Sequence, residues 1–205
     1  MRTGTVIEPN WVEGKAYSYP DFSIRYRHYT HATKSGPVVG IVASIMFTLD
    51  APSDVVWKYM KDFNTFEGPF GIQYSGVWGE LYTSEEHDLG KQTLTYGGAY
   101  EDWTSVPSQV VRVIPQHQLT LFETIPADGS SGGISPGFHT ILLNDHNGKT
   151  VVTAVFEHAE RIAGVTEQEA LQQSMWGPDK YDTETSMKRW RDDFIPTLKK
   201  LIAEK

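Results

Sequence analysis

Hydrophobic and polar residues alternate along residues 40–49, and the spacing changes immediately afterwards. The odd-numbered positions from Ile41 to Leu49 are all apolar, which places them on one face of a β-strand. Pro52 cannot continue a strand, and the next apolar residues recur every three or four positions, as on one face of a helix. The pattern therefore predicts a strand, a tight turn and a short helix, with Asp50 or Ser53 as the helix N-cap.

Six later segments also have the hydrophobic pattern of β-strands. The turn sequence PQHQ joins two of them into a hairpin, and the turn sequence DHNG joins the last two. With residues 40–49 they predict seven antiparallel strands. The six later strands are expected at residues 72–83, 90–98, 108–114, 118–125, 137–144 and 149–159.

The C-terminal part of the chain returns to helical spacing. Thr166 and Glu169 form a capping box, in which each side chain bonds the other residue's backbone N–H, so a helix is predicted to begin there. A longer helix is expected from about Thr183 to Ala203, and Pro196 predicts a kink within it. The apolar stripe of this helix consists of Met187, Trp190, Phe194, Leu198 and Leu201.

The first part of the chain, residues 1–39, shows no sustained hydrophobic period. It is interpreted as an N-terminal extension with one short strand near Ser23–Tyr29, followed by a single domain over residues 40–205. Strands grouped in sequence and flanked by helices indicate an α+β fold, in which the long amphipathic helix buries its stripe on one face of the sheet.

These segments resemble the START-like superfamily, also called SRPBCC, which includes the birch-pollen-allergen proteins and the polyketide cyclase/dehydrase proteins. The resemblance rests on FTLDAPSDVVWKYMKDFNTF, on the hairpin NGKTVVTAVFE and on the closing amphipathic helix, and it covers residues 40–205. It implies a helix-grip fold, a curved seven-stranded sheet wrapped around the C-terminal helix with an apolar cavity between them. Members bind lipids, sterols, hormones, polyketides or aromatic compounds. Some members are cofactor-free enzymes, others are carriers or cochaperones, and the family has no universal catalytic motif.

Composition narrows the classes of partner. The chain has 205 residues, of which 39% are hydrophobic and 12% aromatic, and its net charge is −8. An acidic chain argues against nucleic acid or an acidic membrane as partner, because either would favour a basic face. There are no cysteines, no apolar run near the ~20 residues that cross a bilayer, and no signal-peptide pattern. A cytoplasmic protein that binds a hydrophobic or aromatic small molecule is expected, and a homodimer is compatible with the sequence.

Three residues are candidates for acid/base chemistry. His158 lies at the end of a strand, on the less polar face with Val152, Ala154 and Phe156, where an imidazole could transfer protons near neutral pH. Tyr96 shares the expected inner face of its strand with Leu94 and could orient a ligand carbonyl or hydroxyl. His139 lies on a strand whose two faces are almost equally apolar, so its direction stays open. Each of the three could also be a packed or solvated structural residue.

Other residues are candidates for holding the ligand. Arg112, between two valines, could anchor a ligand carboxylate, although an ion pair with a cross-strand partner such as Glu123 is the simpler explanation. The residues expected to shape the cavity are Trp78, Trp103, Tyr181 and Met187.

One histidine pair has the spacing of two metal ligands on a helix. His28 and His31 are three residues apart, a spacing that suits a helix, but no third ligand is evident, so no metal is expected. The sequence has neither a GxGxxG motif nor a P-loop, and no cofactor is expected.

Two classes of function follow. The first is a cofactor-independent enzyme that performs cyclisation, dehydration or isomerisation, that is, lyase or isomerase chemistry, on an aromatic or polyketide-like molecule. The second is a non-catalytic carrier or sensor of a hydrophobic ligand. A cochaperone-like role has no supporting residue pattern beyond the resemblance.

Overall fold

The structure is a computed structural model, and it describes residues 9–12, 14–61, 93–96, 104–126 and 134–204. Nine strands of this part form one sheet in the order β1-β3-β4-β9-β8-β7-β6-β5, and β2 also pairs with β3. The strands are β1 (Asn10–Val12), β2 (Ala16–Tyr19), β3 (Phe22–His31), β4 (Val38–Leu49), β5 (Thr93–Tyr96), β6 (Thr104–Ile114), β7 (Gln118–Pro126), β8 (Ile134–His146) and β9 (Lys149–Arg161). The helices are α1 (Ser53–Lys61), α3 (Glu167–Gln173), α4 (Thr183–Lys188), the π-helical turn η2 (Arg189–Phe194) and α5 (Ile195–Ala203).

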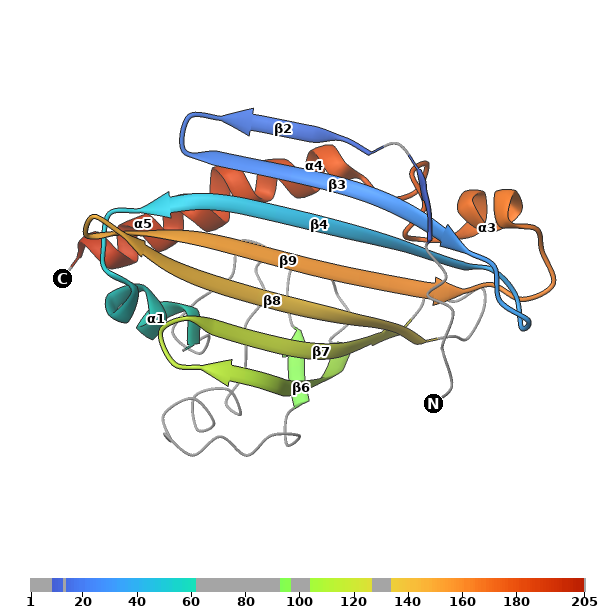
Figure 1. The fold of residues 1–205 in the computed structure, drawn as a ribbon, viewed down its shortest axis with the longest axis horizontal. Helices are drawn as coiled ribbons and strands as arrows, with labels where there is room; N and C mark the ends of the chain where they lie inside the picture. The colour runs from blue at the N-terminus through green and yellow to red at the C-terminus, as the bar shows by residue number, and fades with distance from the viewer. Residues whose placement is uncertain (1–8, 13, 62–92, 97–103, 127–133, 205) are drawn as a thin grey trace, which may run out of the picture.

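The predicted α+β helix-grip fold is confirmed. Every strand pair among the described residues is antiparallel, and the C-terminal helices run along one face of the curved sheet (Figure 1). α1 and the C-terminus lie at one end of the sheet, and α3 lies at the other end (Figure 1). The strand predicted at residues 72–83 is outside the described residues, while β4 to β9 correspond to the other six predicted strands. Within the described part, no helix combines the length and apolarity needed to cross a membrane.

The N-terminal extension contributes strands to the same sheet. β3 pairs with β4 along its whole length, from Phe22 opposite Phe47 to His31 opposite Val38. The short strand predicted near Ser23–Tyr29 is therefore part of a longer one, and the boundary expected at residue 40 falls inside β4. The inward residues of β3 end in His28 and Thr30, and these polar residues weaken the hydrophobic alternation by which a strand is recognised.

The turn between β4 and α1 is fixed from outside the helix. The backbone N–H of Ser53 donates to Asp145 Oδ1 at 2.7 Å, and its hydroxyl donates to Oδ2 at 2.8 Å. The carbonyl of Pro52 accepts the first helical bond, from the N–H of Val56. The prediction of Asp50 or Ser53 as N-cap is therefore wrong, because Ser53 is already helical and Asp50 pairs with a lysine, Lys149, at 2.6 Å.

The long C-terminal helix is confirmed over the predicted length, as α4, η2 and α5 in succession. A kink is predicted at Pro196, and the structure has a π-helical turn that ends just before it, in which the N–H of Ile195 bonds the carbonyl of Trp190. A proline ring clashes with the carbonyl four residues earlier, and a wider turn relieves that clash. The capping box of Thr166 and Glu169 is also confirmed at the start of α3.

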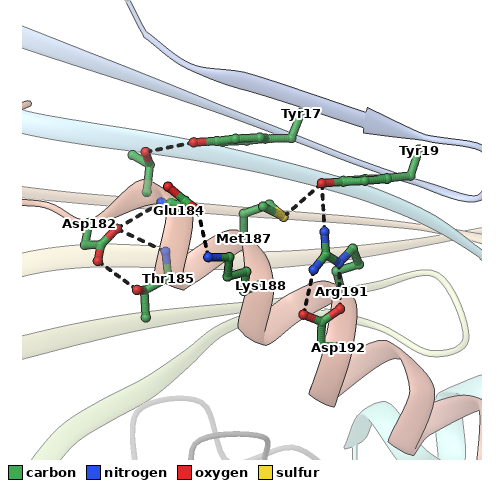
Figure 2. Close-up of polar contacts among 10 residues, drawn as sticks. Tyr17, Tyr19, Asp182, Glu184, Thr185, Met187, Lys188, Arg191 and Asp192 are labelled. Carbon is green, nitrogen blue, oxygen red and sulfur yellow. Dashed lines mark hydrogen bonds and ion pairs between the residues drawn. The ribbon is translucent and has the colours of Figure 1, made fainter.

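The strand β2 holds the first turns of this helix. Tyr17 Oη lies 3.3 Å from Thr183 Oγ1, and Tyr19 Oη donates to Met187 Sδ at 3.6 Å (Figure 2). Arg191 donates to Tyr19 Oη at 2.9 Å and forms a two-bond ion pair with Asp192 (Figure 2). The N-terminal part of the chain therefore fixes where the helix lies on the sheet.

Candidate functional site

The register of the sheet aligns the candidate residues in two adjacent rows of its inner face. In one row His28 is opposite Ile41, Ile41 is opposite His158, and His158 is opposite Gly137. The next row consists of Tyr26, Ala43, Phe156 and His139. The predicted inward face of β9 is thus confirmed, and His139 turns inward with Ile141 and Leu143 while Phe138 is exposed.

The centre of the site is a direct contact between two histidines. His139 Nε2 lies 2.9 Å from His158 Nε2, and the rings are nearly perpendicular, with centroids 5.1 Å apart. A hydrogen bond between two imidazole nitrogens needs one N–H donor and one lone pair. The pair therefore places an acidic and a basic nitrogen side by side, in an interior where His158 is only 3% exposed.

A glycine and a tryptophan hold the His158 ring in place. Gly137 is directly opposite His158, and a Cβ atom there would overlap the imidazole and the backbone carbonyl of Glu157. On the ring's face, Trp176 stacks at 4.7 Å with an interplanar angle of 12°. The side chain is fixed by packing, which a proton-transferring group needs if its geometry is to be kept.

The tautomer of His28 follows from its partner. Its Nδ1 lies 2.7 Å from the backbone carbonyl oxygen of Trp176, and a carbonyl can only accept. Nδ1 must therefore carry the proton. This bond ties β3 to the residue whose ring covers His158.

Two buried polar residues anchor the segment that carries Trp176. Glu160, on β9, accepts the backbone N–H of Met175 at 2.8 Å. Thr30, on β3, donates its hydroxyl to Glu167 of α3 at 2.7 Å, and this bond lowers the pKa of Glu167. The polar residues at this end of the inner face therefore serve to hold α3 and the segment after it against the sheet.

Aromatic and imidazole rings form an unbroken series around the histidine pair. Successive centroids are 5.9, 5.8, 4.7, 5.1, 5.4 and 6.4 Å apart. In order, these rings belong to Tyr26, Tyr181, Trp176, His158, His139, Phe156 and Trp190, and they are called the aromatic arc below. These ring contacts pack β3, β8 and β9 against the C-terminal helix and the segment before it.

Burial makes two of the histidines harder to charge. It lowers the pKa of His139 to about 4, so this imidazole is neutral at neutral pH. Burial also lowers the pKa of His28, against the opposing effect of its bond to the Trp176 carbonyl. Within the histidine pair, a positive charge on His139 is therefore disfavoured.

The structure brings together only part of the predicted site. His139, His158 and Tyr181 belong to the aromatic arc, and Met187 is buried beside it in the core under α4. Arg112 is exposed on β6 and lies opposite Thr120, while Glu123 lies opposite Ser108, so the register does not place Glu123 directly across from Arg112.

Three predicted residues cannot be placed in the arc. Tyr96 is the last residue of β5, opposite Thr104, and its side chain is outside the described residues. Trp78 and Trp103 also lie outside the described residues. Their roles, and the predicted cavity, stay predictions.

The two histidines with metal-ligand spacing, His28 and His31, lie on opposite faces of β3. His28 is buried and His31 lies on the opposite face of β3, because residues three apart on a strand point in opposite directions. Within the described ranges, no cluster of three or more His, Cys, Asp or Glu side chains could hold a metal ion.

Sequence reasoning missed several residues of the site. His28 and Tyr26 lie on a strand that had been assigned only in part, and Trp176 lies in an irregular segment between helices. The signal that could have identified His28 and Tyr26 is the alternation of Phe22, Ile24, Tyr26, His28 and Thr30.

Comparisons with known proteins establish the fold and nothing finer. No protein-family model and no curated protein matches the sequence. Protein CV1439 from Chromobacterium violaceum has a similar structure, with a TM-score of 0.53 and 15% identity over 78% of this chain and 96% of that one. A protein from Arthrobacter aurescens has a TM-score of 0.50 and 17% identity over 80% of this chain and 87% of that one.

A third similar structure is DynU16, a protein in the dynemicin biosynthetic locus, with a TM-score of 0.45 and 15% identity over 78% of this chain and 46% of that one. This likeness is too weak to transfer any role. Membership of the START-like superfamily therefore stays a resemblance, whereas the helix-grip fold is established.

Proposed function

We propose that this protein is a cofactor-independent enzyme that binds an aromatic or polyketide-like small molecule against the aromatic arc. It catalyses cyclisation, dehydration or isomerisation by acid/base proton transfer. The observation that carries the proposal is the 2.9 Å contact between His139 Nε2 and His158 Nε2 in the interior of the fold.

The histidine pair supplies both a proton acceptor and a proton donor at neutral pH. A ligand that enters between the rings replaces their mutual bond with one bond to a lone pair and one to an N–H. Burial disfavours charge on His139, so neutral His139 acts as the hydrogen-bond donor, and we assign His158 as the base that takes the ligand proton.

The aromatic arc orients the ligand. The faces of Trp176 and Phe156 flank the two imidazoles, so a flat ligand packed on the arc brings its C–H bonds to the basic nitrogen. Tyr96 remains the third proposed proton-transferring residue. It is the last residue of β5, opposite Thr104 of β6.

Hydrogen–deuterium exchange into a probe ketone tests the proposal without knowledge of the product. 2-Tetralone, a bicyclic aromatic ketone with enolisable protons, is incubated with the protein in deuterated buffer, and exchange is followed by proton NMR. We expect exchange well above the buffer rate, falling about 100-fold or more in His158→Gln, because general-base catalysis contributes roughly 10² to 10⁴. His31→Gln, a histidine on the opposite face of β3, is the matched control and should retain the full rate.

The outcomes separate the enzyme from the carrier. If a thermal shift shows that 2-tetralone binds but its protons exchange only at the buffer rate, the carrier function replaces the enzyme. If the double variant His139→Gln/His158→Gln exchanges as fast as the wild type, the histidine assignment is wrong. Binding itself is readily seen, since a ligand at 100 times its Kd stabilises a protein by roughly 2.7 kcal/mol.

A further inference from the structure

Three hydroxyl groups meet at the Tyr26 end of the aromatic arc. Tyr26 Oη donates to Ser186 Oγ at 2.7 Å, and Tyr181 Oη donates to the same atom at 3.3 Å. Tyr26 comes from β3, Ser186 from α4, and Tyr181 from the segment before α4. The proton-transfer function proposed above uses none of these three hydroxyls.

The protonation of this cluster follows from its surroundings. Burial raises the pKa of Tyr26 and the pKa of Tyr181, so both phenols keep their protons and act as donors. A serine oxygen has two lone pairs and one proton. With both lone pairs accepting phenol protons, the Ser186 hydroxyl can only donate to a third partner, and hydrogen bonds in series strengthen one another.

We infer that Tyr26, Tyr181 and Ser186 form a binding subsite for a ligand oxygen, in which the Ser186 hydroxyl donates to the carbonyl oxygen of an enolisable aromatic ketone. This inference rests on the proposed proton-transfer function and names the substrate class for it. The geometry supports it because the same arc of rings connects the hydroxyl cluster to the histidine pair.

The chemical step is balanced without a cofactor. The basic imidazole nitrogen takes the proton from the carbon next to the carbonyl, and the C–H electron pair becomes the carbon–carbon double bond of the enolate. The π electrons of the carbonyl move onto its oxygen, where the Ser186 hydroxyl stabilises the negative charge. Return of the proton to the same or to a conjugated carbon completes exchange or isomerisation.

Binding of paired probes tests the oxygen subsite. 2-Naphthol carries an oxygen where the enolate of 2-tetralone would, and naphthalene has the same ring system without it. Equilibrium dialysis should show that the wild-type protein prefers 2-naphthol. In Ser186→Ala, affinity for 2-naphthol should fall about tenfold while that for naphthalene stays the same, as expected for the loss of one hydrogen bond.

Three further variants show which hydroxyl groups cause the preference for 2-naphthol. Tyr26→Phe and Tyr181→Phe should each reduce the preference for 2-naphthol, because each removes one bond that polarises Ser186. Tyr17→Phe is the matched control, since Tyr17 contacts the ring of Tyr26 but its hydroxyl is near Thr183, outside the cluster. Its preference for 2-naphthol should equal that of the wild type.

The result separates this inference from the proposed function. A wild-type protein without preference for 2-naphthol, including one that binds neither probe, overturns the subsite, as does an equal loss of both affinities in Ser186→Ala. If oxygen preference is present but 2-tetralone exchanges no protons, the subsite stands and the enzyme function fails. If exchange occurs and Ser186→Ala leaves its rate unchanged, the enzyme function stands and the subsite is wrong.

Discussion

The two ends of the sheet's inner face have the same architecture and opposite chemistry. Near α5 the inward positions are apolar and buried, as in the row formed by Phe22, Phe47, Val152 and Leu143. Near α3 the same alternating positions hold polar residues that are equally buried: Thr30, His28, His158 and Glu160. One sheet thus supplies a hydrophobic core at one end and a candidate site at the other.

The difference shows how a fold keeps polar groups inside. A buried polar group costs stability unless it is hydrogen-bonded. At the polar end His28, Thr30 and Glu160 each bond to residues 167–176, so the segment that covers this end also satisfies its polar groups. At the apolar end α5 covers the sheet mainly through non-polar packing, in which Leu198 is buried, and an exposed ion pair joins Lys199 to Asp21.

The largest expected effect is at the apolar end. Phe47→Ala removes a side chain that is 1% exposed and packs against Trp190, and it should lower the free energy of unfolding by about 3 to 5 kcal/mol. Urea unfolding measures the change. Met46→Ala, at the neighbouring outward position that is 51% exposed, should change it by less than about 0.5 kcal/mol. Equal losses in the two variants would contradict the assignment of the inner face.

The apolar end was the predictable one. Alternation from Ile41 to Leu49 and the helical stripe around Leu198 identified the strand, the long helix and their buried faces, because non-polar burial leaves a periodic signal. That signal fades along β3, whose inward positions end in His28 and Thr30, and the first part of the sheet was therefore assigned only in part.

The polar end depends on contacts that are distant in sequence. His139 and His158 were candidates, but the direction of His139 was open because the two faces of β8 are similarly apolar. The covering of His158 by Trp176, and the bond of His28 to the Trp176 carbonyl, join residues up to 148 positions apart. No local pattern encodes such pairs, so they require the fold.

Acid should lower the free energy of unfolding through the buried histidines of the polar end, because the apolar end has no such groups among the described residues of its core. The pKa of His139 is about 4 in the folded protein and near 6.5 when unfolded, so between these values the unfolded chain binds more protons. The stabilising contribution is complete above pH 6.5 and is lost as the pH falls toward 4. Urea unfolding at pH 5 should show a loss of about 2 kcal/mol from this residue relative to pH 7.5.

A variant isolates this contribution. His139→Gln has no titratable group at that position, so its unfolding free energy should fall less between pH 7.5 and 5 than that of the wild type. The lowered pKa of His28 adds a loss of the same sign, which remains in this variant. Identical pH dependence in the two proteins would show that His139 is not held neutral by the fold.

The smallest expected effect is the most specific to the polar end. Glu160→Ala leaves the backbone N–H of Met175 without its carboxylate partner and should cost about 1 kcal/mol of stability. Glu160→Gln keeps an acceptor oxygen for that N–H and is the matched control. Because the lost bond anchors the segment that carries Trp176, hydrogen exchange should speed up in residues 174–177 in the alanine variant and remain slow in β4. A uniform increase across the sheet would instead mean that Glu160 supports the whole fold, and the division of the inner face into a packed end and an anchored end would no longer hold.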